Sequence, residues 1–324
     1  MPAILECVSH TPLQGYFDPK PALVAEVARI NAVARERVRA FDPELVVVFA
    51  PDHYNGFFYE LMPSFCVGAK AEAIGDYRSL AGTLPVPAEQ ARAMVEYALN
   101  RDIDMAISYR MSVDHGAAQA LEVVTGGLDS YPVIPVFINS VAPPMSTLRR
   151  SRMMGWVIGE YLKSTGKRVL ILGSGGISHE PPIPELKGAT QEIADRLIYA
   201  GRNLSPQARN ARQERVINAA KAFTAGEAEN MRALNPAWDM AFLKMMQSDL
   251  PAVDRLSNED VSREAGRSAH EIRTWVAAFA ALSAFGDYTA EIDFYQAIPE
   301  WIAGFACMHA SPDAQGEIRC SKRS

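Results

Sequence analysis

The segment "VLILGSGGISHEPP", residues 169–182, carries the clearest structural pattern in the sequence. It begins with a short apolar run, passes through three glycines and reaches His179, which is followed by an acid and two prolines. A short apolar run that ends in turn residues is typical of a buried strand, and the paired prolines disfavour a helix at this point. The segment therefore predicts a strand with a histidine just beyond its end.

Four further runs of this kind occur along the chain, at residues 3–8, 45–50, 104–109 and 132–138. Each is short, apolar and bounded by turn residues, which is typical of a strand buried on both faces. Helical patterns lie between several of these runs, over residues 18–38, 87–100 and 146–163. Strands that alternate with helices predict an α/β fold in which helices cover both faces of a mainly parallel central sheet.

The pattern changes between about residue 186 and residue 285, where polar stretches rich in Ala, Arg, Glu and Met show no convincing strand. We expect an added helical region there. The polar end of the chain, residues 311–324, is typical of a frayed terminus. No internal repeat or low-complexity linker is visible, so we expect a single catalytic α/β domain over residues 1–310, followed by this C-terminal tail.

The composition excludes several classes of function. The 324 residues carry a formal net charge of −6, with 32 basic and 38 acidic side chains, so no basic field attracts nucleic acid. No apolar run approaches the ~20 residues of a membrane span, and the first residues lack a signal-peptide pattern. The four cysteines are too widely separated for a disulfide framework or a zinc knuckle. We therefore expect a cytoplasmic protein without nucleic-acid or membrane partners.

Four of the six histidines follow expected strands, namely His10, His53, His115 and His179. The carboxyl ends of parallel strands meet at one edge of a sheet, where α/β proteins bind their ligands. A single histidine in such a place is more often a hydrogen-bonded structural residue. Four in equivalent positions favour a shared role, so the sequence predicts that these imidazoles converge on one cleft.

Imidazole is the commonest protein ligand of transition metals, and two imidazoles with one carboxylate form the open triad of non-haem Fe(II) oxygenases. The other two histidines would then be free for proton transfer. The carboxylate has several candidates, and spacing does not choose among them: Asp52, Asp114, Glu180 and Glu271.

Several segments together carry a family likeness that runs from about residue 3 to residue 306. They are "CVSHTPLQGYFDP", "LVVVFAPDHYNGFFYELMPSFCVG", "VDHGAAQALE", "PVIPVFINSVAPP", "RVLILGSGGISHEPPIPEL", "SAHEIRTWVAAFAALSAFG" and "IPEWIAGF". With the spacings between them, they resemble the class III (LigB-type) extradiol ring-cleavage dioxygenases. Within that class they are similar to the members that cleave 2,3-dihydroxyphenylpropionate and 2,3-dihydroxycinnamate in phenylpropanoid degradation.

The resemblance implies a mononuclear Fe(II) held by His10, His53 and Glu271. It also implies that His115 is the proton donor and His179 the proton acceptor. The substrates would be a catechol and dioxygen, and the product of 3-(2,3-dihydroxyphenyl)propanoate would be 2-hydroxy-6-oxonona-2,4-diene-1,9-dioate. Members of this class also lead us to expect a homo-oligomer.

Such a substrate carries a carboxylate that an arginine or a set of amide donors would hold. Three arginines lie near the motifs, but nothing in the sequence chooses among them: Arg110, Arg267 and Arg273. Four aromatic residues close to His53 are candidates for a pocket wall, although such clusters are more often core or subunit interface. They are Tyr54, Phe57, Phe58 and Tyr59.

Three alternatives stay open at this point. The same histidines would suit a zinc-dependent hydrolase with a water on the open position of the metal. They would also suit a structural or regulatory α/β protein in which they serve packing. Finally, an extradiol enzyme of this class could have another catechol as its main substrate.

Overall fold

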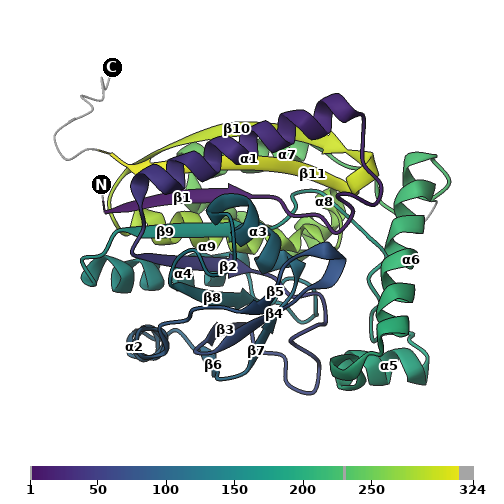
Figure 1. The fold of residues 1–324 in the computed structure, drawn as a ribbon, viewed down its shortest axis with the longest axis horizontal. Helices are drawn as coiled ribbons and strands as arrows, with labels where there is room; N and C mark the ends of the chain where they lie inside the picture. Colours follow the sequence, from purple (N-terminus) through teal and green to yellow (C-terminus); the bar gives the residue numbers. More distant parts are fainter. Residues whose placement is uncertain (1, 229–230, 314–324) are drawn as a thin grey trace.

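The computed structural model describes residues 2–228 and 231–313 of the 324-residue chain. Its main element is an eight-stranded sheet with the order β10-β11-β1-β9-β2-β8-β3-β6 (Figure 1). The centre of this sheet is parallel and consists of β1 (Ala3–Val8), β9 (Val169–Ser174), β2 (Leu45–Ala50) and β8 (Val133–Ile138). Nearly all residues of these four strands are buried, which explains their uninterrupted apolar sequences.

The sheet as a whole is mixed, so the expectation of a mainly parallel sheet holds for the centre and not for the edges. At one edge, β10 (Tyr288–Ile298) and β11 (Ala303–Pro312) form an antiparallel pair, and β11 is antiparallel to β1. Only the short turn η5 (Pro299–Trp301) joins them, and a short connection between neighbouring strands requires antiparallel pairing. At the other edge, β3 (Phe65–Gly68) is antiparallel to β8.

Sequence reasoning missed β10, β11 and a small second sheet made of β5 (Ala81–Thr83), β4 (Ala71–Ile74) and β7 (Met111–Val113). β10 alternates between more and less buried residues and includes acids, so it shows no apolar run. The buried strand expected at residues 104–109 is instead the three-residue edge strand β6 (Ala106–Ser108), none of whose residues is fully buried. An edge strand has a neighbour on one side alone, which leaves it open to solvent.

Helices cover both faces of the sheet, as predicted. α1 (Pro21–Phe41) and α3 (His115–Thr125) pack on one face, against side chains such as Val46 and Leu172. α2 (Ala88–Leu99), α4 (Leu148–Ser164) and α9 (Ile272–Ser283) pack on the other face, against side chains such as Val47 and Ile171. Alternate residues of each central strand therefore supply two separate apolar cores.

The two helices α4 and α9 lie unusually close to each other because α4 has glycines at their contact. A Cβ atom at Gly155 would lie 2.2 Å from the carbonyl oxygen of Ala277, and one at Gly159 would lie 2.2 Å from that of Ala281. This tight contact fixes α9 against α4, and Glu271 immediately precedes α9.

Residues 186–285 are helical, as predicted, and the described part of this region contains no strand. It comprises α5 (Gln191–Ile198), α6 (Pro206–Thr224), α7 (Pro236–Ser248) and α8 (Asn258–Ala265), together with α9. α9 is a layer of the main core, whereas α5 and α6 stand beyond the carboxyl ends of β1 and β9 (Figure 1). None of the helices formed by the described residues is long and apolar enough to span a membrane.

The polar tail was expected to begin after Ala310, but β11 continues to Pro312 and pairs with β10 over this length. Residues 314–324, which make up the rest of the expected tail, lie outside the described residues.

Candidate active site

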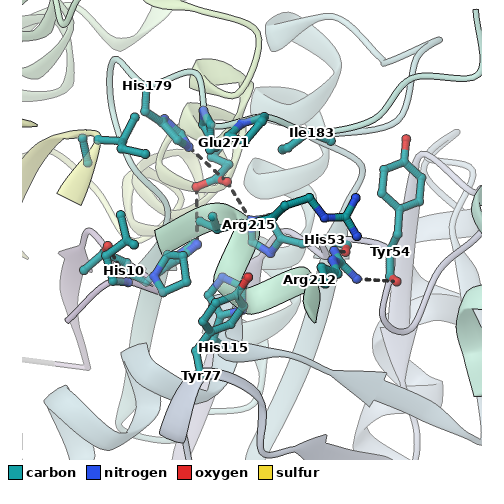
Figure 2. A pocket seen from close by; sticks show the side chains of 18 of the residues that line it. His10, His53, Tyr54, Tyr77, His115, His179, Ile183, Arg212, Arg215 and Glu271 are labelled. Atoms are coloured by element: carbon teal, nitrogen blue, oxygen red, sulfur yellow. Dashed lines mark hydrogen bonds and ion pairs between the residues drawn. The ribbon is translucent and has the colours of Figure 1, made fainter. Parts of the chain in front are cut away.

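The structure places the four strand-end histidines and Glu271 on the wall of one cavity at the carboxyl ends of the central strands (Figure 2). His10 follows β1, His53 follows β2 and His179 follows β9, whereas His115 is the first residue of α3. Glu271 ends the 3₁₀ turn η4 (Ala269–Glu271) just before α9. Parallel strands that end at one edge bring these distant residues together.

The imidazoles of His10, His53 and His115 form a compact group. The ring centres of His10 and His53 are 5.4 Å apart, those of His10 and His115 are 5.4 Å apart, and His53 stacks on His115 at 4.5 Å. The Nε2 atom of His179 lies across the group, 3.3 Å from Glu271 Oε1. The glutamate therefore links the imidazole of His179 to those of His10 and His53.

Hydrogen bonds determine the tautomer of His10. Ser174 Oγ donates its proton to the carbonyl of Gly116, so it accepts from His10 Nδ1–H at 3.0 Å. Burial lowers the pKa of His10 to about 3, which makes this imidazole neutral. Its Nε2 therefore carries no proton, and this nitrogen lies 3.5 Å from Glu271 Oε2.

His53 lies between two carboxylates. Its Nδ1 is 3.0 Å from Asp114 Oδ2, and its Nε2 is 3.0 Å from Glu271 Oε1. Burial by itself lowers the pKa of His53, but the charges of Asp114 and Glu271 outweigh it and raise the pKa well above its usual value. A positive charge is therefore favoured between His53 Nε2 and Glu271, and a proton or a metal ion would supply it.

Glu271 is 1% exposed, so its charge depends on neighbouring groups. Burial raises the pKa of a carboxyl, yet the neighbouring imidazoles, first of all that of His179, outweigh it and lower the pKa of Glu271 well below its usual range. The backbone N–H of Gly176 also donates to Oε2 at 2.9 Å. Glu271 is therefore an anion aimed at the imidazole nitrogens.

A metal ion fits this donor set. Two imidazole nitrogens face one buried carboxylate, and such a carboxylate needs a compensating cation. Two histidines and one carboxylate on one face of a metal are the set that non-haem Fe(II) uses with open positions. Each of these histidines has its other ring nitrogen held by a hydrogen bond, as metal-ligating histidines require.

Two other groups of side chains could also hold a metal, because their ligand atoms lie within 4.8 Å of one another: His10, His53 and His115, or Asp76, Asp114 and His115. In the second group both carboxylates already accept hydrogen bonds from backbone N–H groups and imidazoles. The first group has no carboxylate. The set of His10, His53 and Glu271 combines two imidazole nitrogens with a buried carboxylate.

His115 is supported by a carboxylate. Asp76 Oδ2 lies 2.7 Å from His115 Nδ1, and Asp76 Oδ1 accepts from the backbone N–H of His115 at 2.7 Å. A carboxylate against one ring nitrogen fixes the tautomer and stabilises the positively charged imidazolium. Asp76 therefore fixes the orientation and the tautomer of the His115 ring.

His179 is supported by a neutral group instead. Its Nδ1 lies 3.1 Å from the carbonyl oxygen of Ile177, which can only accept, so Nδ1 carries the proton. The Nε2 atom faces Glu271 Oε1 at 3.3 Å, so a proton on Nε2 is shared with that carboxylate. Two histidines in one cavity with different partners are suited to opposite proton-transfer roles.

The glycines of the opening segment allow His179 and Glu271 to approach. A Cβ at Gly175 would lie 2.8 Å from the Cβ of Glu271, and a Cβ at Gly176 would lie 3.0 Å from the ring of His179. Side chains at these two positions would push the carboxylate and the imidazole apart. This explains why the strand ends in glycines before the histidine.

Asp239 holds the loop that carries His179. Its carboxylate accepts from the backbone N–H of Ser178 at 3.0 Å, from Ser178 Oγ at 2.7 Å and from Tyr295 Oη at 2.7 Å. The Asp239 side chain is fully buried, and backbone hydrogen bonds also join Ile177 and Ser178 to Gly304. Sequence reasoning missed Asp239, which lies on α7 and has no motif around it.

The other three carboxylates weighed from the sequence do not line the cavity. Asp52 accepts from the backbone N–H groups of three residues in the following turn and shapes the loop after β2. Asp114 caps α3 and supports His53. Glu180 pairs with Arg267 and with Arg232.

The three arginines near the motifs also lie outside the cavity lining. Arg110 is exposed, Arg267 pairs with Glu180 and Glu185, and Arg273 is buried against His270 and the carbonyl of Ser146. The arginines that do line the cavity are Arg196, Arg212 and Arg215, which come from α5 and α6. No sequence signal distinguished them from the other arginines of these polar helices.

Among the four aromatics near His53, Tyr54 lines the cavity. Phe57 stacks on Phe137 at 3.8 Å and Phe58 is fully buried, so both serve packing. The aromatic wall is completed by Tyr77 and Trp301, which sequence reasoning did not single out. The remaining wall is largely apolar and includes Leu13, Pro181, Pro182, Ile183, Leu197, Val216 and Ile302.

Comparisons with known proteins agree over nearly the whole chain. The model of the family described as "Catalytic LigB subunit of aromatic ring-opening dioxygenase" matches residues 5–306. Proteins named "2,3-dihydroxyphenylpropionate/2,3-dihydroxicinnamic acid 1,2-dioxygenase" are similar to this chain. The one from Cupriavidus pinatubonensis is 64% identical and aligns over 97% of this chain and 100% of its own. The one from Klebsiella pneumoniae subsp. pneumoniae is 54% identical over the same shares.

Among solved structures, an uncharacterized protein from Escherichia coli K12 superposes with a TM-score of 0.49 and 14% identity, covering 94% of this chain and 98% of its own. The family assignment rests on the sequence matches, which extend over the strands, the histidine loops and η4. The chain belongs to the family of catalytic LigB subunits of aromatic ring-opening dioxygenases.

Proposed function

We propose that this protein is an Fe(II)-dependent extradiol dioxygenase that cleaves the ring of 3-(2,3-dihydroxyphenyl)propanoate and of its cinnamate analogue. Both atoms of dioxygen enter the product, which for 3-(2,3-dihydroxyphenyl)propanoate is 2-hydroxy-6-oxonona-2,4-diene-1,9-dioate. The observation that carries the proposal is one buried carboxylate faced by two supported imidazoles, with two further histidines beside them. The names of relatives at 54–64% identity support the choice of substrate.

His10, His53 and Glu271 would hold the iron. Iron bound there would keep the two catechol oxygens and dioxygen side by side and allow electrons to pass between them. The protein's part is to keep both histidines in the correct tautomer, which Ser174 and Asp114 do through the opposite ring nitrogens.

His179 acts as general base in this proposal. Its Nδ1–H is held by the carbonyl of Ile177, so Nε2 accepts the proton of a catechol hydroxyl. Removing that proton increases the electron density of the ring. The position of Nε2 beside Glu271 puts the base next to the catechol oxygens.

His115 acts as general acid. Asp76 stabilises its imidazolium form, so Nε2 can donate a proton to the oxygen that departs during ring opening. The apolar and aromatic side chains around the cavity exclude water, which strengthens these interactions and protects the reacting ring.

Dioxygen uptake tests the proposed function. Protein loaded anaerobically with Fe(II) is mixed with 3-(2,3-dihydroxyphenyl)propanoate, and oxygen consumption and visible absorbance are recorded together. We expect stoichiometric uptake with a yellow ring-opened product, and neither signal from zinc-loaded protein. No uptake by verified iron-loaded protein, with this substrate and with a panel of other catechols, would overturn the proposal and favour a hydrolase.

Asp239→Asn is expected to weaken the loop that presents His179. The amide has one accepting oxygen in place of two, so at least one buried donor of Ser178 or Tyr295 loses its partner. An unsatisfied buried donor costs about 1–3 kcal/mol, so urea denaturation should show a loss of stability of that size. Turnover should fall while iron content stays unchanged, because Asp239 contacts none of the iron-binding residues.

Tyr295→Phe is the matched comparison, since it removes one of the three donors and leaves the carboxylate intact. Its effect should be smaller than that of Asp239→Asn. Equal stability of Asp239→Asn and the wild type would show that the carboxylate does not hold this loop.

We further propose that the protein is cytoplasmic and assembles as a homo-oligomer. The three described cysteines, Cys7, Cys66 and Cys307, are free and buried, which suits a reducing compartment. Large apolar side chains on the surface, among them Leu61 at 78% exposed, favour contacts between copies. A monomeric mass by light scattering at working concentration would contradict the assembly.

A further inference from the structure

The cavity wall carries three arginines in addition to the histidines and Glu271. Arg196 lies on α5, and Arg212 and Arg215 lie one turn apart on α6, and all three line the same cavity as the histidines. Figure 2 shows Arg212 and Arg215 on the side of His53 and Tyr54, away from His179 and His10. α5 and α6 therefore contribute three positively charged side chains to the cavity wall, beyond the carboxyl ends of the strands.

These positive charges have no anionic counterpart in the cavity. Among the described residues that line it, Glu271 is the one acidic side chain, and its oxygens face the imidazoles and Gly176. Within the described part of the chain, no carboxylate lies within 4.0 Å of a guanidinium nitrogen of Arg196, Arg212 or Arg215. Other arginines of the same polar region do have such partners, as Arg202 has Glu60 and Arg232 has Glu180.

The three guanidinium groups are close enough to repel one another. Burial lowers the pKa of Arg196, and the charges of Arg215 and Arg212 lower it further. Like charges brought together at the edge of an apolar cavity are unfavourable unless an anion joins them. The arrangement therefore favours the binding of an anionic group between these arginines.

Arg212 already has a structural task. It donates to the backbone carbonyls of His53 and Tyr54 and to Asn55 Oδ1, so it holds the loop that carries His53. Tyr54 in this loop has a positive φ of 54°, a conformation that needs such support. Arg212 is thus a positioning residue, whereas no described group accepts a hydrogen bond from the side chain of Arg196 or Arg215.

We propose that Arg196 and Arg215 bind the carboxylate of the substrate's side chain and so select catechols that carry an anionic chain next to the hydroxyls. This inference rests on the proposed function, because the catechol oxygens must lie at the His10, His53 and Glu271 side. A guanidinium group donates two parallel hydrogen bonds to a carboxylate, which gives both affinity and orientation. Between the two ends, Tyr54 and Ile183 supply a wall for the ring and the methylene carbons.

The test compares two substrates that differ in one group, 3-(2,3-dihydroxyphenyl)propanoate and its neutral amide. For the acid, we expect kcat/KM to fall about 10- to 100-fold in Arg215→Met and in Arg196→Met, the effect of a lost charged hydrogen bond. For the amide, kcat/KM should change less than about 3-fold, since a neutral chain does not depend on the charge. Arg209→Met is the matched control on α6, because Arg209 does not line the cavity, and it should leave both values unchanged.

A second measurement needs neither metal nor turnover. Binding of 3-phenylpropanoate, which has the carboxylate but no hydroxyl groups, is measured by calorimetry with metal-free protein. Arg215→Met and Arg196→Met should weaken it by about 10-fold or more, Arg215→Lys by less, and Arg209→Met not at all.

The outcomes separate this inference from the proposed function. Suppose that the wild type cleaves both compounds, but that kcat/KM falls in the two variants to the same extent for the acid and for the amide. The arginines then do not bind the carboxylate, and the inference is wrong. If the wild type cleaves neither compound, the proposed function fails, and the 3-phenylpropanoate titration still decides the anion site. Equal binding of 3-phenylpropanoate by wild type and both variants would overturn the inference.

Discussion

Glu271→Gln is expected to release iron and to abolish ring cleavage. Glutamine has nearly the same shape, but it removes the negative charge that His10 and His53 face and puts an amide N–H₂ in place of one oxygen. Loss of a residue that only hydrogen-bonds to a metal ligand lowers metal affinity by ~10–100-fold. Loss of the ligand Glu271 itself should lower metal affinity by more than that. The measurement is iron content by mass spectrometry after anaerobic loading and gel filtration, together with dioxygen uptake.

Two further variants make this result decisive. Glu180→Gln removes a nearby carboxylate that pairs with arginines, and it should keep its iron. His115→Gln should also keep its iron if Glu271 completes the site. If His115→Gln instead empties the site while Glu271→Gln does not, the ligands are His10, His53 and His115, whose nitrogens are also close enough.

His179→Gln and His115→Gln are expected to lower turnover by ~10²–10⁴-fold with iron still bound. Glutamine can donate and accept hydrogen bonds but does not carry a proton through the reaction. Steady-state dioxygen uptake with iron-normalised protein measures the loss. Full turnover of either variant would contradict the role given to that histidine.

The pH dependence of turnover distinguishes the base from the acid. A general base must be deprotonated, so activity that depends on it is lost as the pH falls, whereas a general acid must be protonated and its contribution is lost as the pH rises. His179→Gln should therefore remove the acidic limb of the profile of kcat, and His115→Gln the alkaline limb. The reverse assignment of limbs would exchange the two roles, in spite of the support that Asp76 gives to His115.

The central part of the fold could be predicted from local sequence because burial on two faces leaves a strong pattern. β1, β2, β8 and β9 are apolar at nearly every position, and each was recognised. β10 and the strands of the small sheet were missed because they face solvent on one side or are only three or four residues long. Their pairing depends on neighbours far along the chain, and no local window contains those.

The strand-end position of the four histidines was also visible in the sequence, since it follows from the direction of the strands. The selection of Glu271 among four carboxylates was not. Asp52, Asp114 and Glu180 each adjoin one of the four histidines along the chain, whereas Glu271 does not. They are excluded because each is occupied by a turn, a helix cap or an arginine. Those hydrogen bonds and ion pairs exist only once the chain has folded.

The sequence by itself determined the parallel centre of the sheet, the helices on its two faces and the histidines at its carboxyl edge, because these follow from local apolar patterns and from strand direction. The tertiary structure was needed to show which buried acid faces the histidines, and that Arg196 and Arg215 share their cavity. The contacts of His10 with Ser174, and of His10, His53 and His179 with Glu271, join residues that are 92 to 261 positions apart. The physical reason is that charge and hydrogen bonding act through space over a few ångströms, whereas a sequence pattern records only neighbours along the chain.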